Sequence, residues 1–174
     1  MKDTPGTDGL NVFVGGLSRA ELRSALAARG ILLNEHAETL LAAEIFDGQD
    51  ARVISITETT VADLGRPDGA TLPEIFEWAQ EKGLLLCPAD AGPYLRLALG
   101  DQAASADTVM SAGRAPDGAL TVASELLSDD DEYPKGFYLR VVEGLAWLRG
   151  YRCDDDYVFS GSDRFAFRTP APSP

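Results

Sequence analysis

The chain has 174 residues, of which 45% are hydrophobic and 25% are charged, and its formal net charge is −13 at pH 7. This composition excludes an intrinsically disordered chain, and the length favours one core over two independent ones. Because the charge has the sign of a phosphate backbone, direct nucleic-acid binding is disfavoured, whereas a basic protein partner, or solubility alone, accounts for such a surface.

The two ends of the chain, residues 1–10 and 169–174, are rich in Gly, Pro, Ser and Thr and are predicted to be disordered tails. No window approaches the roughly 20 apolar residues that a membrane helix needs, and no apolar signal segment is present near the start. Cys87 and Cys153 are too few for a disulfide framework. We therefore expect a cytoplasmic protein with reduced cysteines and no membrane segment.

Two short helices are predicted near the N-terminus, after an apolar segment at 11–14. Ser18 and Glu21 have the spacing of a capping box, in which each side chain satisfies a backbone amide of the first turn. Gly30 then follows as a left-handed C-terminal cap. Asn34 is placed to cap the second helix.

A strand and a third helix come next. Residues 52–60 alternate in polarity and are largely β-branched, which favours a half-buried strand. Thr71 and Glu74 form another capping box, and Gly83 ends the helix that they begin. Residues 84–99 are apolar, and we expect a core strand, a turn, and then either a second strand or a short helix.

The C-terminal part changes to alternating segments separated by turns such as Glu143-Gly144. The expected strands are 108–113, 119–126, 137–142, 145–153 and 165–167. Short helices with one or two strands, followed by an antiparallel β-meander, predict an α+β fold. In this interpretation a helical α+β lobe at 11–100 and an antiparallel β lobe at 101–168 share one core.

Motifs for the large enzyme classes are missing. The sequence has neither the phosphate-binding loop G-x-x-x-x-G-K-[ST] nor G-x-G-x-x-G or G-x-S-x-G. Its single histidine, His36, can act as a general base only with Glu35 or Glu38, and a surface or cap role is the simpler interpretation. Cys87 is expected to be a small core residue, and the acidic run after Cys153 weakens that thiol as a nucleophile. We expect no cofactor and lean against enzymatic activity.

Two acidic clusters are the candidates for a metal site. Asp154, Asp155 and Asp156 follow one expected strand, and a second cluster lies at 129–132. Carboxylate oxygens at this density suit Mg²⁺ or Ca²⁺, and a metal held by aspartates can support phosphodiester hydrolysis. Solvated acidic turns between strands are the alternative.

Aromatic and arginine side chains gather in the C-terminal strands. Such residues dominate the energetics of protein interfaces, so they are candidates for a partner-binding face. Core packing of the rings, and pairing of the arginines with the acidic turns, are the alternatives. The residues of the candidate face are Arg140, Trp147, Arg149, Tyr151, Arg152 and Tyr157.

Several segments carry a family resemblance that covers nearly the whole chain. These are 34–40, 63–70, 86–97, 147–157 and 163–167. Together they resemble a family of small uncharacterised bacterial proteins, some of which carry a helicase label. The resemblance implies a bacterial origin and supplies no mechanism, since the nucleotide-binding motifs that such a label requires are not in the sequence.

Three functions follow from these observations. The first is a non-enzymatic acidic interaction module of the antitoxin, immunity or regulatory type, with a basic protein as partner. The second is a metal-dependent hydrolase or nucleic-acid-processing protein that uses the aspartate clusters. The third is a small-molecule sensor with a pocket between the helices and the sheet, a function that no particular residue indicates.

Overall fold

The structure, a computed structural model, describes residues 10–48, 50–99, 119–128, 130, 132–153 and 155–170. These residues form both helices and strands along the first hundred positions and strands alone afterwards. In chain order they are β1 (Leu10–Val14), α1 (Arg19–Ala28), β2 (Leu32–Leu33), α2 (Glu35–Leu41), the 3-10 helix η1 (Glu44–Phe46), β3 (Arg52–Thr60), β4 (Ala70–Thr71), α3 (Leu72–Glu81), α4 (Ala91–Ala98), β5 (Leu120–Val122), β6 (Gly136–Val142), β7 (Leu145–Tyr151), β8 (Val158–Phe159) and β9 (Arg164–Thr169). The predicted α+β class is confirmed.

Seven of the strands form one sheet in the order β1-β3-β9-β5-β6-β7-β2. Neighbours are antiparallel except for β5 with β9 and β2 with β7, which are parallel. Strands from the last third of the chain therefore form the middle of the sheet, and strands from the first part of the chain form its two edges. β4 and β8 make a separate two-stranded pair.

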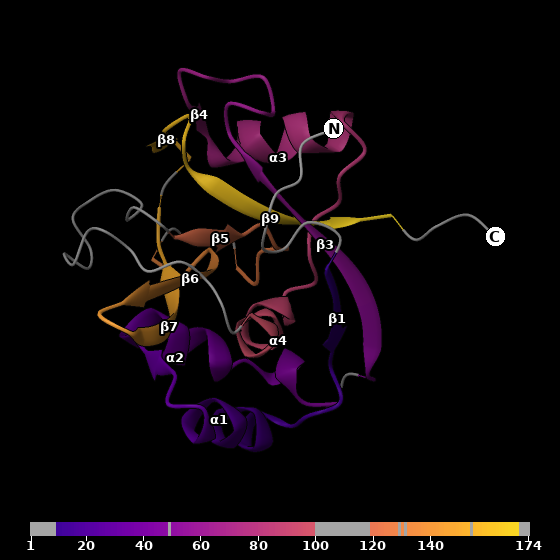
Figure 1. The fold of residues 1–174 in the computed structure, drawn as a ribbon, viewed down its shortest axis with the longest axis vertical. Helices are drawn as coiled ribbons and strands as arrows, with labels where there is room; N and C mark the ends of the chain where they lie inside the picture. The colour runs from indigo at the N-terminus through magenta and orange to yellow at the C-terminus, as the bar shows by residue number, and fades with distance from the viewer. Residues whose placement is uncertain are drawn as a thin grey trace.

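The sheet curls around α4, which is buried over nearly its whole length. All residues from Ala91 to Arg96 are buried, and α4 contacts β1, β6 and β7. In Figure 1, α4 lies inside the curl with α1 and α2 on its open side. Gly92 makes this fit close, because a Cβ at that position would lie 2.5 Å from the ring of Phe137 on β6.

The other face of the sheet carries a second cluster of buried side chains. Alternation along β9 directs Ala166 toward the cluster around α4, and Phe165 and Phe167 toward the second cluster. The second cluster includes Ile75 of α3 and Phe159 of β8. Figure 1 shows α3, β4 and β8 together at one end of the molecule.

The helix starts follow the predicted caps. Ser18 and Glu21 make both bonds of a capping box at α1, and Thr71 and Glu74 make both at α3. Asn34 caps α2 by accepting a bond from the amide of Ala37 at 2.8 Å. These starts are fixed by local chemistry and do not depend on the distant strand pairing.

The strand arrangement differs from the predicted meander. β6 and β7 form the expected hairpin, but β9 pairs antiparallel with β3 and parallel with β5. Both rings of β9 pack into the second cluster, with Ile75 of α3 and Phe159 of β8. The described residues have a buried cluster on each face of the sheet.

Several sequence predictions lie at the margins of the described residues. Leu10 begins β1 and Thr169 ends β9, whereas the rest of the predicted tails, 1–9 and 171–174, lies outside the described residues. The predicted strand at 108–113 lies outside them as well. Of the two alternatives for the end of the run 84–99, the short helix is the one found, because isolated bridges at Leu85 and Cys87 precede the helix α4.

Candidate functional site

Most of the predicted partner-face residues lie together on the β6–β7 hairpin. Register pairs Tyr138 with Arg149, Arg140 with Trp147, and Gly136 with Tyr151. Because side chains alternate between the faces of a strand, Arg140, Trp147, Arg149 and Tyr151 lie on one face. Tyr138 joins them, although the sequence did not single it out for the site.

Both arginines of the hairpin face are buried, and Arg149 lies over two aromatic rings. The guanidinium carbon of Arg149 lies 5.6 Å from the ring centre of Tyr138 and 5.4 Å from that of Trp147. Such distances are those of cation–π contacts, which strengthen when the cation is desolvated. Arg140 is 0% exposed and Arg149 is 6% exposed, whereas Trp147 is half-buried. We define the hairpin face by Tyr138, Arg140, Trp147, Arg149 and Tyr151.

The remaining two predicted residues lie elsewhere. Arg152 is exposed, alternates away from the hairpin face, and its Nη1 lies 2.6 Å from a carboxylate oxygen of Glu132. Tyr157 packs edge-on against Phe159 with ring centres 4.8 Å apart. The pairing of Arg152 with an acidic turn is the alternative that the sequence left open for the arginines.

The hairpin face continues into the second buried cluster through a series of rings. Tyr138 and Tyr151 have ring centres 6.4 Å apart, and Tyr151 and Phe159 have ring centres 6.5 Å apart. Phe159 in turn lies 5.2 Å from Phe165. Burial raises the pKa of both tyrosines, so their hydroxyls stay protonated at neutral pH.

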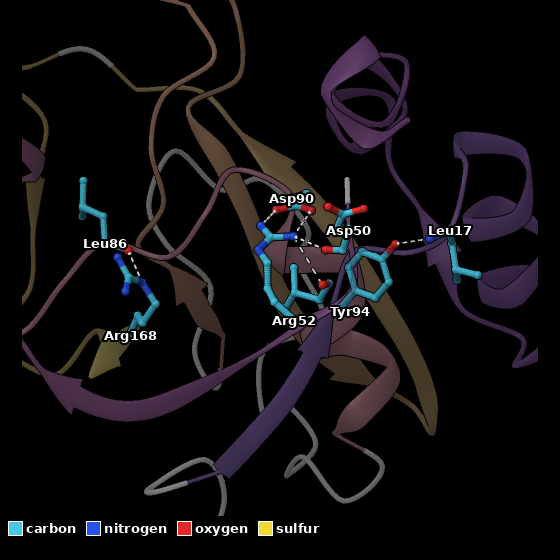
Figure 2. A network of polar contacts seen from close by, with 8 residues as sticks. Leu17, Asp50, Arg52, Leu86, Asp90, Tyr94 and Arg168 are labelled. Atoms are coloured by element: carbon cyan, nitrogen blue, oxygen red, sulfur yellow. Dashed lines mark hydrogen bonds and ion pairs between the residues drawn. The ribbon is translucent and has the colours of Figure 1, made fainter. Parts of the chain in front are cut away.

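A polar network outside the predicted site joins β3 to the start of α4 (Figure 2). Arg52 Nη2 donates to Asp90 Oδ1 at 2.7 Å, and Arg52 Nη1 donates to Asp90 Oδ2 at 3.2 Å. Arg52 Nη1 also lies 3.3 Å from the carbonyl oxygens of Val14 and Asp50. The Asp90 carboxylate is buried, whereas 35% of the Arg52 side chain is exposed.

The same region is closed by Tyr94, one turn along α4. Its hydroxyl oxygen accepts a bond from the Leu17 amide at 3.2 Å, and burial raises its pKa. At Gly15, which has φ of +93°, a Cβ would lie 2.4 Å from the Asp50 carbonyl oxygen. Arg52 bonds to Val14, Asp50 and Asp90 at once, so the geometry of this network fits a structural lock between β1, β3 and α4.

One signal in the sequence points to this network. Asp90 and Arg96 are the two charged residues in the apolar run 84–99. A charged group in such a run needs a partner, because an isolated buried charge is too costly. Asp90 forms an ion pair with Arg52, and Arg96 donates a hydrogen bond to the carbonyl oxygen of Leu99 at 2.6 Å.

The aspartates proposed as metal ligands are only partly described. Asp154 lies outside the described residues, and Asp155 and Asp156 are exposed in the turn before β8. In the other acidic cluster, at 129–132, Asp130 accepts a hydrogen bond from the backbone amide of Glu132. Across the described ranges, no three His, Cys, Asp or Glu side chains lie close enough together to hold a metal ion.

Cys87, the candidate nucleophile, is buried, and His36, the candidate base, is half-buried. Cys87 is buried, as predicted, and burial raises the pKa of its thiol to about 12, which leaves almost no thiolate at neutral pH. Its thiol is directed at the carbonyl oxygen of Ala166, 3.7 Å away. His36 is half-buried at the start of α2, and its pKa is lowered, first by burial and then by Arg152.

Exposed carboxylates gather at the end of the molecule formed by α3, β4 and β8. In Figure 1 these elements lie together, with the loop at 61–69 beside them. Lys82 is the exposed cation there, whereas Arg66 is half-buried, bonds to Glu74, and lies 5.3 Å from the ring of Trp78. We call this region the acidic end, and its exposed carboxylates are Asp63, Asp68, Glu77, Glu81, Asp155 and Asp156.

The opposite end, formed by α1 and α2, has a different balance of charge. Arg19 pairs with Asp47 at 2.7 Å, and Arg23 lies 3.7 Å from Glu38. These contacts offset part of the negative charge locally. The negative charge of the acidic end is therefore less compensated by neighbouring cations than that of the end formed by α1 and α2.

Comparison with protein-family models, with curated proteins and with solved structures found no match to this chain. No described helix combines the length and apolar character that crossing a membrane requires.

Proposed function

We propose that this chain is a non-enzymatic interaction module that binds a basic protein partner at its acidic end. The observation that carries the proposal is that the described residues of this end present six exposed carboxylates and one exposed cation, Lys82. A field of one sign steers an oppositely charged partner and raises its association rate. The net charge of −13 extends the same attraction over longer distances.

The sign of the charge also selects the class of partner. A phosphate backbone or an anionic lipid surface is attracted by clustered Lys and Arg, and is repelled by carboxylates. A protein segment rich in Lys and Arg has the complementary charge. Antitoxins, immunity proteins and regulators that cover a basic surface have this chemistry.

Apolar groups at the acidic end supply a place for close contact. Val158 on β8 is 57% exposed, and it follows Asp155 and Asp156 closely in sequence. Trp78 on α3 is half-buried beneath the guanidinium of Arg66. Charge steers the encounter, and a few buried apolar anchors then hold the complex.

The reactive groups support a binding role over catalysis. The thiol of Cys87 is buried and protonated, and the carboxylate of Asp90 is occupied by a two-point contact with Arg52. A catalytic nucleophile or base needs access to substrate and a pKa near the working pH. Neither group meets both conditions.

The test compares two variants with equal loss of negative charge. The first carries Asp68→Asn, Glu77→Gln and Glu81→Gln at the acidic end. The control carries Glu35→Gln, Glu44→Gln and Asp50→Asn, which are exposed carboxylates near the opposite end. Each protein is immobilised, exposed to lysate of its host at low salt, and then titrated by NMR with a synthetic arginine-rich peptide.

We expect a stoichiometric partner that elutes with salt from wild type and control, and that the acidic-end variant loses. The peptide should shift amide signals of α3 and β8 more than those of α1. Equal loss of binding in both variants would contradict the location. Recovery of no stoichiometric partner would contradict the function.

A further inference from the structure

The outer face of β1 and β3 exposes two large apolar side chains that are direct neighbours. Phe13 is 73% exposed and Val53 is 53% exposed, and the strand register places them opposite each other. The other large exposed apolar residues of the described chain lie apart from each other in sequence: Leu126 between β5 and β6, Leu145 in β7 and Val158 in β8. Phe13 is the most exposed of all five.

A second property of this face is that none of the described outward residues of β1 and β3 is ionisable. Alternation directs the charged residues of β3, Arg52 and Glu58, to the face around α4, where Arg52 meets Asp90 and Glu58 meets Arg164. On the outer face, Asn11 accepts a bond from the Ser55 hydroxyl at 2.6 Å. The outward residues of the two strands are Asn11, Phe13, Val53, Ser55, Thr57 and Thr59.

We propose that this face is the contact surface for a second copy of the chain. Two copies that each carry a charge of −13 repel each other wherever carboxylates meet. The uncharged face of β1 and β3 is where that repulsion is least and where apolar area is available. A basic partner gains no Coulomb energy from an uncharged surface, so the charge pattern favours self-association here.

A symmetric dimer uses the same patch twice. In a two-fold contact, Phe13 of one copy packs near Phe13 and Val53 of the other. β1 is an edge strand, and from Leu10 to Val14 it has no charged residue or proline of the kind that keeps edges apart. Two side chains supply well under the roughly 800 Å² per partner of a standard interface, so the dimer is weak and concentration-dependent.

Salt separates this contact from the basic partner of the proposed function. Added salt screens the repulsion between the two acidic copies and therefore strengthens the dimer. The same salt weakens attraction between the acidic end and a basic segment. The two proposals thus predict opposite responses to one variable, and the failure of one leaves the other standing.

The test uses sedimentation equilibrium of wild type, Phe13→Arg, Phe13→Glu and an equimolar mixture of the two variants. We expect wild type to dimerise at high protein concentration, more strongly in high salt. Each variant alone should lose at least tenfold in association, because like charges then meet across the axis. The mixture should recover association, because Arg and Glu then face each other.

Control variants separate a folding defect from a lost contact. Phe13 points outward, so both variants should unfold at the wild-type temperature, and Leu145→Ser, which removes an exposed leucine elsewhere, should leave association unchanged. A wild type that stays monomeric at millimolar concentration in high salt would overturn the proposal. So would variants that associate as wild type does, or a mixture that stays monomeric.

Discussion

The side-chain amide of Asn34 bonds to both backbone groups of Gly150, 116 positions later in the chain. Asn34 Nδ2 donates to the Gly150 carbonyl oxygen at 3.0 Å, and the Gly150 amide donates to Asn34 Oδ1 at 2.8 Å. The same Oδ1 accepts the bond from Ala37 that caps α2. One amide therefore starts a helix and extends the parallel pairing of β2 with β7.

Replacing Asn34 should cost more than replacing an ordinary helix cap. Asn34→Ala removes the cap and leaves both backbone groups of Gly150 without their partner, so we expect a loss of about 2 to 4 kcal/mol in unfolding free energy. Ser18→Ala, which removes a cap with no cross-sheet bond, should cost about 1 kcal/mol. Urea unfolding of the two variants measures the difference, and equal losses would contradict the double role.

Breaking the Arg52–Asp90 pair should be asymmetric. In Arg52→Met the Asp90 carboxylate stays buried without its ion partner, and we expect a loss of about 2 to 4 kcal/mol, below the range for a fully buried pair because 35% of Arg52 is exposed. In Asp90→Asn, Arg52 keeps the carbonyls of Val14 and Asp50, so the loss should be about 1 to 2 kcal/mol.

A double-mutant cycle checks that this asymmetry belongs to the pair. The loss in the double variant should be smaller than the sum of the two single losses, because the second substitution removes the group that the first leaves stranded. Additive losses, or a larger loss for Asp90→Asn, would contradict the interpretation of the network as a lock on a buried carboxylate.

Local chemistry was predictable from the sequence. The caps at Ser18, Asn34 and Thr71, the strand at 52–60, and the hairpin turn at Glu143-Gly144 each follow from a few adjacent residues. Gly30 and Gly83 adopt positive φ after their helices, as the C-terminal cap signal requires. Such patterns involve only residues close in sequence, so they do not depend on which strands pair in the sheet.

Long-range pairing was not predictable in the same way. Alternation says that one face of 164–169 is buried, but it does not name β3 and β5 as the neighbours. The run 84–99 was ambiguous for a related reason. All residues of α4 from Ala91 to Arg96 are buried, and Gly92 and Pro93 near its start are residue types that also mark turns, so the sequence did not separate a helix from a strand.

In the candidate site too, contacts between residues close in sequence were predictable, and contacts between distant segments were not. Trp147 and Arg149 were recognisable because two strands close in sequence form the hairpin face. The contact between Arg52 and Asp90 joins β3 to α4 and needs the whole fold to bring it together. Only the presence of a charge within an apolar run signalled that Asp90 has a partner.

Divalent cations should leave the thermal unfolding temperature unchanged. A metal that binds the native state raises that temperature by mass action, by several degrees once the ion exceeds its Kd about a hundredfold. Because Asp155 and Asp156 are exposed in a turn, we expect no shift with millimolar Mg²⁺, Mn²⁺ or Ca²⁺. A rise that Asp155→Asn with Asp156→Asn abolishes would instead support the metal-dependent hydrolase.

Acid should weaken the fold through His36 in a window just below neutral pH. Burial, and then the charge of Arg152, lower the pKa of His36 in the folded chain below its ordinary value of 6.5. The unfolded chain therefore takes up the proton at a higher pH than the folded chain does. The neutral form stabilises the fold fully above pH 6.5, and this contribution is lost as the pH falls through 6.5 toward the folded pKa.

His36→Gln isolates this effect, because glutamine stays neutral throughout. Between about pH 7.5 and 5.5 the unfolding temperature of wild type should fall further than that of the variant. Hydrogen bonds from backbone amides lower the pKa of Asp47 and Glu74, but these groups lose their contribution only near their own, lower pKa values. The window of His36 is thus separate from theirs.

Direct titration gives the decisive measurement, since the chain has one histidine and its ring proton signal is unambiguous in NMR. We expect a pKa below 6.5 in wild type and a higher pKa in Arg152→Gln, in which the second-largest cause of the shift is removed. A pKa of His36 at or above 6.5, or no change in Arg152→Gln, would mean that α2 does not hold the ring against β7 as the structure has it.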